Sequence, residues 1–390
     1  MENIFKKIIV HFDEIGLKGK NQPFFVKQVI KNIEQKLGLG VKASRAEGKL
    51  QIELPSNADI KKMINLLKFT PGVSTINPGL QCLSEMDQIE KQALAVVHFY
   101  KQNTFKIETT RSYKPFELNS LQVSSQVGAY VLQNADFELK VDVHKPELTV
   151  KVEVAKRKTF VLGKKEKGLG GLPVGTAGKV ICLLSGGLDS PVAGFQMMKR
   201  GAEVIFVHFH NQTINKVGVQ NKIKKLVTQL SKVQGSCKLI IVPFSDLQKS
   251  VIAHIPADVR MIVYRRLMYR IAEQIAVENK VQALVAGDSL AQVASQTMEN
   301  LQVIYQATSM LKFAPLIGMN KNEIINIAEQ IGTYAISIEP YEDCCSLMIA
   351  KHPQTRAKLE EVLKVEQNLE VNDLISQAIN MSEISEFKAN

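Results

Sequence analysis

The feature that most constrains this chain is a glycine-rich loop joining a short apolar run to a helical pattern. The run Val180–Leu184 leads directly into Ser185-Gly-Gly-Leu-Asp-Ser190, and Pro191 follows at a position that suits the first turn of a helix. Gly186 and Gly187 allow a sharp turn and a close approach of backbone to ligand. The order strand, loop, helix directs backbone N–H groups and the positive end of a helix dipole at one point, where a pyrophosphate group would bind.

The polar side chains of this loop support the same interpretation. Ser185 and Ser190 offer hydroxyl donors, and we expect Ser190 to cap the following helix. Asp189 is a carboxylate at the point where phosphates would bind, so we expect it to hold Mg²⁺ or to orient an attacking group. An ordinary glycine-rich turn is the alternative, but the full string in this setting favours a nucleotide site.

Short apolar runs alternate with helical patterns from this loop to the end of the chain. The runs 203–208, 238–242 and 283–286 have the character of strands buried on both faces, as 180–184 does. We therefore predict a doubly wound α/β domain with a parallel sheet over residues 179–390.

The chain before this domain predicts two smaller α+β domains, residues 1–58 and 59–165. The expected strands are 7–12, 49–54, 104–109, 138–143 and 148–154. The expected helices are 24–37, 59–68, 87–100 and 120–133. Residues 166–178 are rich in Gly and Lys and lack periodicity, which predicts a linker.

The positive charge of the chain lies mainly in its front half. The formal net charge is +11, and residues 1–175 hold 27 Lys and Arg against 18 Asp and Glu, whereas residues 176–390 hold 22 against 20. This asymmetry favours a front half that binds a polyanion such as nucleic acid. A basic surface without a partner is the alternative that charge alone leaves open.

The cysteines and the apolar segments indicate the compartment. The N-terminus does not resemble a signal peptide, and no run of about 18 apolar residues is present. An odd number of cysteines, five, suits a reducing cytoplasm rather than a disulfide framework. Cys344 and Cys345 form the one adjacent pair, and a thiolate there would accept or attack sulfur. We interpret Cys82, Cys182 and Cys237 as core or bystander residues.

Several strings resemble the tRNA 4-thiouridine synthetases, a family within the PP-loop pyrophosphatase superfamily. They are Glu14-Ile-Gly-Leu-Lys-Gly-Lys20, Gly170-Gly-Leu-Pro-Val-Gly175, Leu184 to Gly194, Met198-Lys-Arg-Gly201, His208-Phe-His210, Ala286 to Thr297, Gly318-Met-Asn-Lys321, Asp343-Cys-Cys-Ser346 and Lys351-His-Pro353. The resemblance covers nearly the whole chain. It implies an N-terminal ferredoxin-like domain, a THUMP RNA-binding domain and a C-terminal PP-loop domain.

The resemblance also implies a two-step reaction. O4 of uridine 8 in tRNA would attack the α-phosphate of ATP, and persulfide sulfur on a cysteine would then displace AMP to give 4-thiouridine. The chain resembles the short form of the family, which lacks a rhodanese-like domain and would take sulfur from a cysteine desulfurase. Members of the family also pass sulfur to a ThiS-like sulfur carrier protein for thiamine synthesis, and a homodimer is compatible with the resemblance. No iron–sulfur or zinc spacing is present.

The resemblance assigns roles to individual residues. Those implied to bind ATP are Leu183, Leu184, Ser185, Gly186, Gly187, Ser190, His208, Phe209, Arg265, Gly287 and Gln296. Lys321 would neutralise charge on phosphate or on the developing adenylate. Cys345 matches the catalytic cysteine of the family, with Cys344 as a resolving thiol. The chemical roles thus fall on Asp189, Lys321, Cys344 and Cys345.

For tRNA, the basic turns of the front half are the candidates: Arg111, Lys114, Lys156, Arg157 and Lys158. Tyr113 and Phe116 beside them would either stack on a tRNA end or belong to the core. Two rival functions remain at this stage. One is a PP-loop ligase that forms AMP while acting on a small molecule, and the other is a degenerate module that merely binds RNA.

Overall fold

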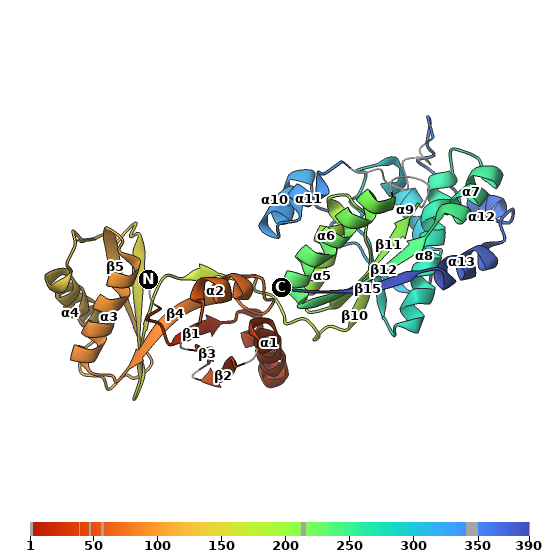
Figure 1. The fold of residues 1–390 in the computed structure, drawn as a ribbon. Helices are drawn as coiled ribbons and strands as arrows, with labels where there is room; N and C mark the ends of the chain where they lie inside the picture. The colour runs from red at the N-terminus through yellow and green to blue at the C-terminus, as the bar shows by residue number, and fades with distance from the viewer. Residues whose placement is uncertain are drawn as a thin grey trace. The chain divides into compact units, whose positions relative to one another are not determined.

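The computed structural model divides the chain into two compact units, Met1–Gly171 and Leu172–Asn390 (Figure 1). It describes residues 3–38, 40–46, 48–55, 58–211, 216–340 and 350–389, with the side chains of 216–219 excepted. Within these residues no helix combines the length and apolar character needed to cross a bilayer.

The first unit is built on one continuous sheet of nine strands. Along the sheet the strands are β2 (Lys42–Ala46), β3 (Lys49–Glu53), β1 (Lys7–His11), β4 (Thr75–Cys82), β8 (Thr159–Leu162), β7 (Leu148–Val154), β5 (Thr104–Arg111) and β6 (Lys140–Val141), with β9 (Glu166–Lys167) also on β4. The helices are α1 (Gln22–Leu37), α2 (Ile60–Lys68), α3 (Met86–Tyr100) and α4 (Ser120–Asn134), and a 3₁₀ segment spans Glu14–Asn21. The two predicted α+β regions therefore share a sheet.

Strand β4 at the centre of this sheet was not predicted, because its sequence contains Asn-Pro-Gly, a combination typical of turns. Pro78 nevertheless lies opposite Ile8 of β1, and Gly79 lies opposite Leu162 of β8. A Cβ on Gly79 would stand 2.7 Å from Leu162, so the glycine permits the close approach of the two strands.

The segment expected as a linker, 166–178, is packed rather than free. It contains β9, and Gly168 and Gly170 donate backbone hydrogen bonds to the loop that precedes β4. Residues 168–174 are buried, and the boundary between the two units falls inside this run.

The second unit is the doubly wound α/β domain that the sequence predicts. Its sheet has the order β14 (Leu311–Phe313), β13 (Ala283–Val285), β10 (Lys179–Leu183), β11 (Glu203–His210), β12 (Ser236–Pro243) and β15 (Glu383–Lys388). All neighbours pair in parallel except β15, which lies antiparallel to β12. The two edge strands were not predicted, because β14 is short and β15 is half-polar.

Helices cover both faces of this sheet (Figure 1). One group of helices that pack on one another consists of α5 (Asp189–Lys199), α6 (Lys216–Gln234), α10 (Lys321–Gln330) and α11 (Tyr334–Ser337). A second group consists of α8 (Arg260–Glu278) and the helices that pack on it, which are α7 (Ser245–His254), α9 (Met298–Tyr305), α12 (Leu359–Glu366) and α13 (Val371–Asn380). The chain adds β11 and β12 on one side of β10 and then returns to β13 on the other side, so crossovers of the usual right-handed sense place these groups on opposite faces.

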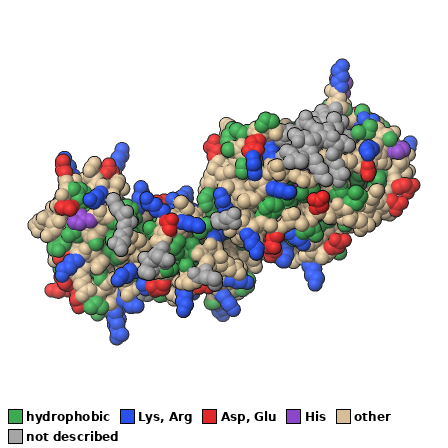
Figure 2. Space-filling view, in the orientation of Figure 1, with side chains coloured by type: hydrophobic (Ala, Val, Ile, Leu, Met, Phe, Trp, Pro, Cys, Tyr) green, Lys and Arg blue, Asp and Glu red, His purple; other side chains and the backbone are tan. Residues whose placement is uncertain are grey.

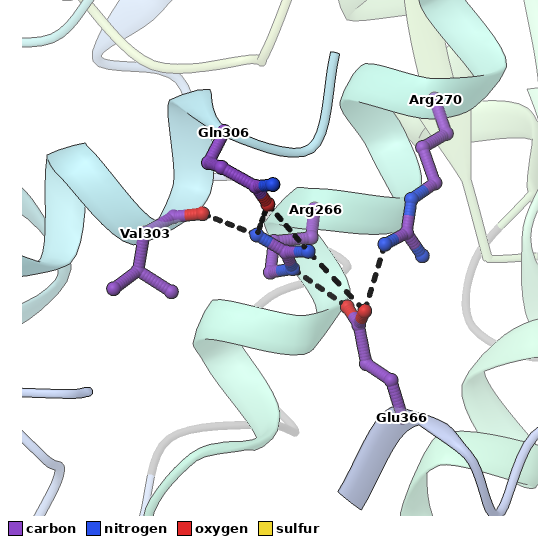
Figure 3. A network of polar contacts seen from close by, with 5 residues as sticks. All are labelled: Arg266, Arg270, Val303, Gln306 and Glu366. Atoms are coloured by element: carbon purple, nitrogen blue, oxygen red, sulfur yellow. Dashed lines mark hydrogen bonds and ion pairs between the residues drawn. The ribbon is translucent and has the colours of Figure 1, made fainter. Parts of the chain in front are cut away.

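A buried ionic network joins three helices of the second group (Figure 3). Arg266 of α8 is fully buried, and its Nε lies 2.7 Å from Oε1 of Glu366 at the end of α12. Arg270, one turn along α8, reaches Oε2 of Glu366 at 2.7 Å. Arg266 also donates to the carbonyl oxygen of Val303 in α9 and to Gln306. The network therefore fixes α9 and α12 on α8.

We predict that Glu366→Gln lowers the free energy of unfolding by about 3–5 kcal/mol, because it leaves buried guanidinium charge without its carboxylate. Asp246→Asn, which breaks an exposed ion pair with Lys249, should cost less than about 1 kcal/mol. Urea unfolding followed by circular dichroism measures both. Equal losses in the two variants would contradict a structural role for the network.

Candidate active site

The loop Ser185–Ser190 is closed by its own two serines. The backbone N–H of Ser185 donates to Oγ of Ser190 at 2.8 Å, and the two hydroxyl oxygens lie 3.0 Å apart. Gly187 N–H donates to Oγ of Ser185 at 3.3 Å. The prediction that Ser190 caps the helix is wrong: α5 begins at Asp189, so Ser190 lies within its first turn and bonds back to the loop. The hydroxyl fixes the turn, and the free N–H groups of the helix start remain for a ligand.

Asp189 is held from two sides. Nζ of Lys321 lies 2.8 Å from its Oδ1, and Nε2 of Gln292 lies 2.9 Å from its Oδ2. Lys321 is the first residue of α10, whose start is fixed by a capping box between Asn320 and Glu323. The geometry thus unites two residues predicted to do chemistry.

Gln292 was given no role from the sequence. It follows Ala291, whose φ of 61° is a left-handed conformation that costs a non-glycine residue energy. Gln292 lies 103 residues from Asp189, and neither this pairing nor the backbone conformation can be read from the sequence.

His208 and Phe209 lie near the end of β11. Nδ1 of His208 lies 2.8 Å from the carbonyl oxygen of Leu184, and His208 is fully buried. The ring of Phe209 packs on Phe244 with centroids 5.0 Å apart. Their side chains therefore support the fold, and the contact of His208 and Phe209 with a nucleotide, which the resemblance implies, stays a prediction.

A cavity of about 590 Å³ opens at the carboxyl ends of β10 and β13. Open α/β sheets bind ligands at this edge. The predicted site residues that line it are Leu183, Ser185, Asp189, Ser190, Arg265, Gly287 and Gln296. The predicted residues outside its lining are Leu184, Gly186, Gly187, His208, Phe209 and Lys321. Much of the remaining wall is apolar: Ala257, Met261, Ile262, Met268, Val293 and Pro353.

The lack of a side chain at Gly287 allows two backbone segments to pack closely at the edge of the cavity. A Cβ at this position would lie 2.7 Å from the backbone nitrogen of Ser190 and 2.9 Å from the carbonyl carbon of Asp189. The end of β13 therefore packs directly against the start of α5, and only glycine fits.

Arg265 is paired with a buried carboxylate in the cavity wall. Its Nη2 lies 2.7 and 2.8 Å from the two oxygens of Asp288, and its Nη1 donates to the carbonyl oxygen of Ser295 at 3.3 Å. Burial alone would lower the pKa of Arg265, but the Asp288 carboxylate reverses this and the net shift is upward. The guanidinium therefore stays charged at every physiological pH.

The predicted catalytic cysteines, Cys344 and Cys345, lie outside the described residues. In the sequence Cys345 stands five residues before Ala350, which lines the cavity. The other three cysteines are free thiols, and burial raises the pKa of Cys82 to about 11 and of Cys182 to about 12, and that of Cys237 further still. Such thiols are poor nucleophiles, in agreement with their interpretation as bystanders.

The basic residues of the first unit that the sequence predicts to bind tRNA lie at one end of its sheet. Because β5 and β7 pair in parallel with Arg111 opposite Val154, the turns that follow them are neighbours. Lys114 in the first turn and residues 156–158 in the second are exposed. Arg111 itself donates to the carbonyl oxygen of Phe116 at 3.0 Å and so braces the first turn. On the face that Figure 2 shows, further Lys and Arg side chains are scattered over the first unit.

Within the described residues, no group of three or more His, Cys, Asp or Glu side chains is placed to hold a metal ion.

Comparison with known proteins matches three successive stretches of the chain to described families. Residues 175–371 match the family described as thiamine biosynthesis protein (ThiI), residues 84–162 match the THUMP domain, and residues 7–77 match the ThiI ferredoxin-like domain. A probable tRNA sulfurtransferase of Caldanaerobacter subterraneus subsp. tengcongensis is 42% identical over 94% of this chain and 96% of its own length. That of Halothermothrix orenii is 38% identical over 99% and 100%.

Solved structures agree. A 4-thiouridine synthetase in complex with RNA and bound ATP has a TM-score of 0.89 and 34% identity, covering 98% of this chain and 100% of that one. The protein PH1313 from Pyrococcus horikoshii, at 22% identity and a TM-score of 0.64 over 84% of this chain and 99% of that one, shares the fold.

We predict that Gly287→Ala weakens ATP binding by tenfold or more, which corresponds to about 1.4 kcal/mol. The added methyl group would displace the backbone of Asp189 and Ser190, and with it the amides of the loop. Gly318→Ala is the matched control, because nothing lies within 4 Å of a Cβ there. Calorimetric titration with ATP measures the affinity, and an unchanged value for Gly287→Ala would refute the importance of this contact.

Proposed function

The chain belongs to the ThiI family of tRNA sulfurtransferases, and on this premise we propose that it adenylates O4 of uridine 8 in tRNA and inserts persulfide sulfur to give 4-thiouridine. The observation that carries the proposal is the closed Ser185–Ser190 loop with Asp189 paired to Lys321 beside the cavity. A loop that had lost its function would have no reason to keep this arrangement, which speaks against a degenerate RNA-binding module.

In the first step, O4 of the uracil attacks the α-phosphate of ATP, and N3 loses its proton to solvent as the double bond shifts from C4=O4 to C4=N3. The bond from that phosphorus to the oxygen bridging to the β-phosphate breaks, and pyrophosphate leaves. The N–H groups at the start of α5 bind the phosphates, and Lys321 offsets the negative charge that develops. Both oxygens of Asp189 accept from Lys321 and Gln292 in this structure. Release of these contacts would let the carboxylate bind Mg²⁺, which prefers one or two carboxylates plus substrate phosphates and would polarise the phosphoryl oxygens.

In the second step, the outer sulfur of a persulfide on Cys345 attacks C4, and AMP leaves with the former O4. The thiolate of Cys344 then attacks Sγ of Cys345, breaks the sulfur–sulfur bond, and leaves the transferred sulfur on the base, where N3 takes up a proton from solvent. The two cysteines become a disulfide, which an external dithiol must reduce before the next cycle. Each attack requires a deprotonated sulfur, because the thiolate and not the thiol is the nucleophile.

Two partners follow from this chemistry. A cysteine desulfurase would load the persulfide, and a ThiS-like sulfur carrier protein would be a second acceptor, since an adenylated carboxylate reacts in the same way as adenylated uracil. A homodimer is part of the same proposal. The alternative, a PP-loop ligase for a small molecule, accounts for the second unit but leaves the RNA-binding THUMP match of the first without a purpose.

We predict that Cys345→Ser retains ATP-dependent adenylation of tRNA, with release of pyrophosphate, but yields no 4-thiouridine. Asp189→Ala should abolish both products. Cys82→Ser is the control, because the raised pKa of that thiol makes it unreactive. The assay incubates unmodified tRNA with Mg-ATP, cysteine and a desulfurase and analyses the nucleosides. Normal 4-thiouridine from Cys345→Ser would sink the cysteine assignment.

We also predict that replacing Lys156, Arg157 and Lys158 with Ala flattens the dependence of log K for tRNA on log salt by about 2, because each lost phosphate contact removes about 0.7–0.9 from the slope. Lys140→Ala is the control, since Lys140 pairs with Thr104 at the opposite end of β5 from Arg111. An unaltered slope would place the RNA elsewhere.

A further inference from the structure

Two successive arginines of α8 are each paired with a buried carboxylate, but in different surroundings. Arg266 meets Glu366 inside the helical layer (Figure 3), whereas Arg265 meets Asp288 in the wall of the nucleotide cavity. Asp288 is 3% exposed and directly follows Gly287 at the end of β13.

Three side chains from three elements converge on Asp288. Arg265 of α8 contacts both carboxylate oxygens. Nε2 of Gln296 donates to Oδ1 at 3.1 Å, and the hydroxyl of Tyr305 donates to Oδ2 at 2.9 Å. An ionised carboxylate accepts hydrogen bonds only, so all three contacts are satisfied at once.

The contact with Gln296 determines which end of its amide is available. Because Asp288 can only accept, the NH₂ end of Gln296 must face it, and the Oε1 end points elsewhere. Gln296 is 9% exposed and lines the cavity, and its Oε1 is buried without a hydrogen-bond partner among the described residues. A buried acceptor of this kind is costly unless a ligand supplies an N–H or O–H donor.

The contact with Arg265 fixes a long side chain that would otherwise sample many rotamers. Its charge is neutralised within the wall, so the guanidinium remains buried beside the cavity rather than turning to solvent. Arg265 and Gln296 come from different elements, and Asp288 is the group that both of them contact.

We propose that Asp288 is a positioning residue of the nucleotide site, which holds Arg265 and Gln296 in the orientation that contacts ATP without touching ATP itself. The proposal rests on the function proposed above, in which Arg265 and Gln296 bind the nucleotide. It differs from a purely structural role, for which the Arg266–Glu366 pair one residue along the same helix is the example.

A double-mutant cycle on the full-length protein separates these roles, with ATP as the probe in calorimetric titration. Asp288→Asn keeps the size of the side chain, and we expect the Kd for ATP to rise about tenfold. In an Arg265→Gln background the same change should raise the Kd by less than about threefold, because residues that act through one another are not additive. Glu366→Gln should lower the Tm and leave the Kd unchanged.

A milder variant guards against loss of folding in Asp288→Asn. Tyr305→Phe removes only one hydroxyl donor from Asp288, and we expect a Kd about two- to threefold higher with an unchanged Tm. An unchanged or lower Kd in Asp288→Asn, or full additivity with Arg265→Gln, would overturn the proposal while leaving the enzymatic function intact. If the wild-type protein binds no ATP, both the proposed function and this inference fail.

Discussion

The packing of Gly287 against the first turn of α5 is the contact on which the rest of the site depends. It brings the end of β13 within a few ångströms of the loop backbone. The residue after Gly287 then lies in the cavity wall, and the turn that follows brings Gln292 to Asp189. At Gly287, two segments almost a hundred residues apart in the chain thus meet backbone to backbone.

The sequence was sufficient for the parts of the protein that follow local rules. The apolar runs that became β10 to β13 and the glycines of the loop determine their own structure, because burial on both faces and the geometry of a tight turn leave recognisable patterns. It was not sufficient where tertiary contacts override a local signal. Pro78 and Gly79 are residue types typical of turns, yet they lie in a central strand that the sequence did not predict, and Ser190 bonds to Ser185 instead of capping its helix.

Long-range side-chain pairs were the other limit. Asp288 stood within a recognised string, yet its three partners lie up to 23 residues away and belong to separate elements. No periodicity marks a residue whose work is to orient others. Arg265 and Arg266 illustrate the same point, because they are neighbours of the same residue type in the sequence. In the structure Arg265 pairs with Asp288 in the cavity wall, whereas Arg266 pairs with Glu366 and joins helices.

The shared sheet of the first unit has a consequence for how this protein can be divided. Strand β4 pairs with β1 on one side and with β8 on the other, so β8 returns from residues 159–162 to complete a sheet begun at residue 7. A fragment ending near residue 83 would leave one edge of β4 without its partner, and an open edge of this kind invites pairing between molecules. The ferredoxin-like part is therefore expected to aggregate when expressed by itself, and a cut at Gly171 is the natural place to separate the two units.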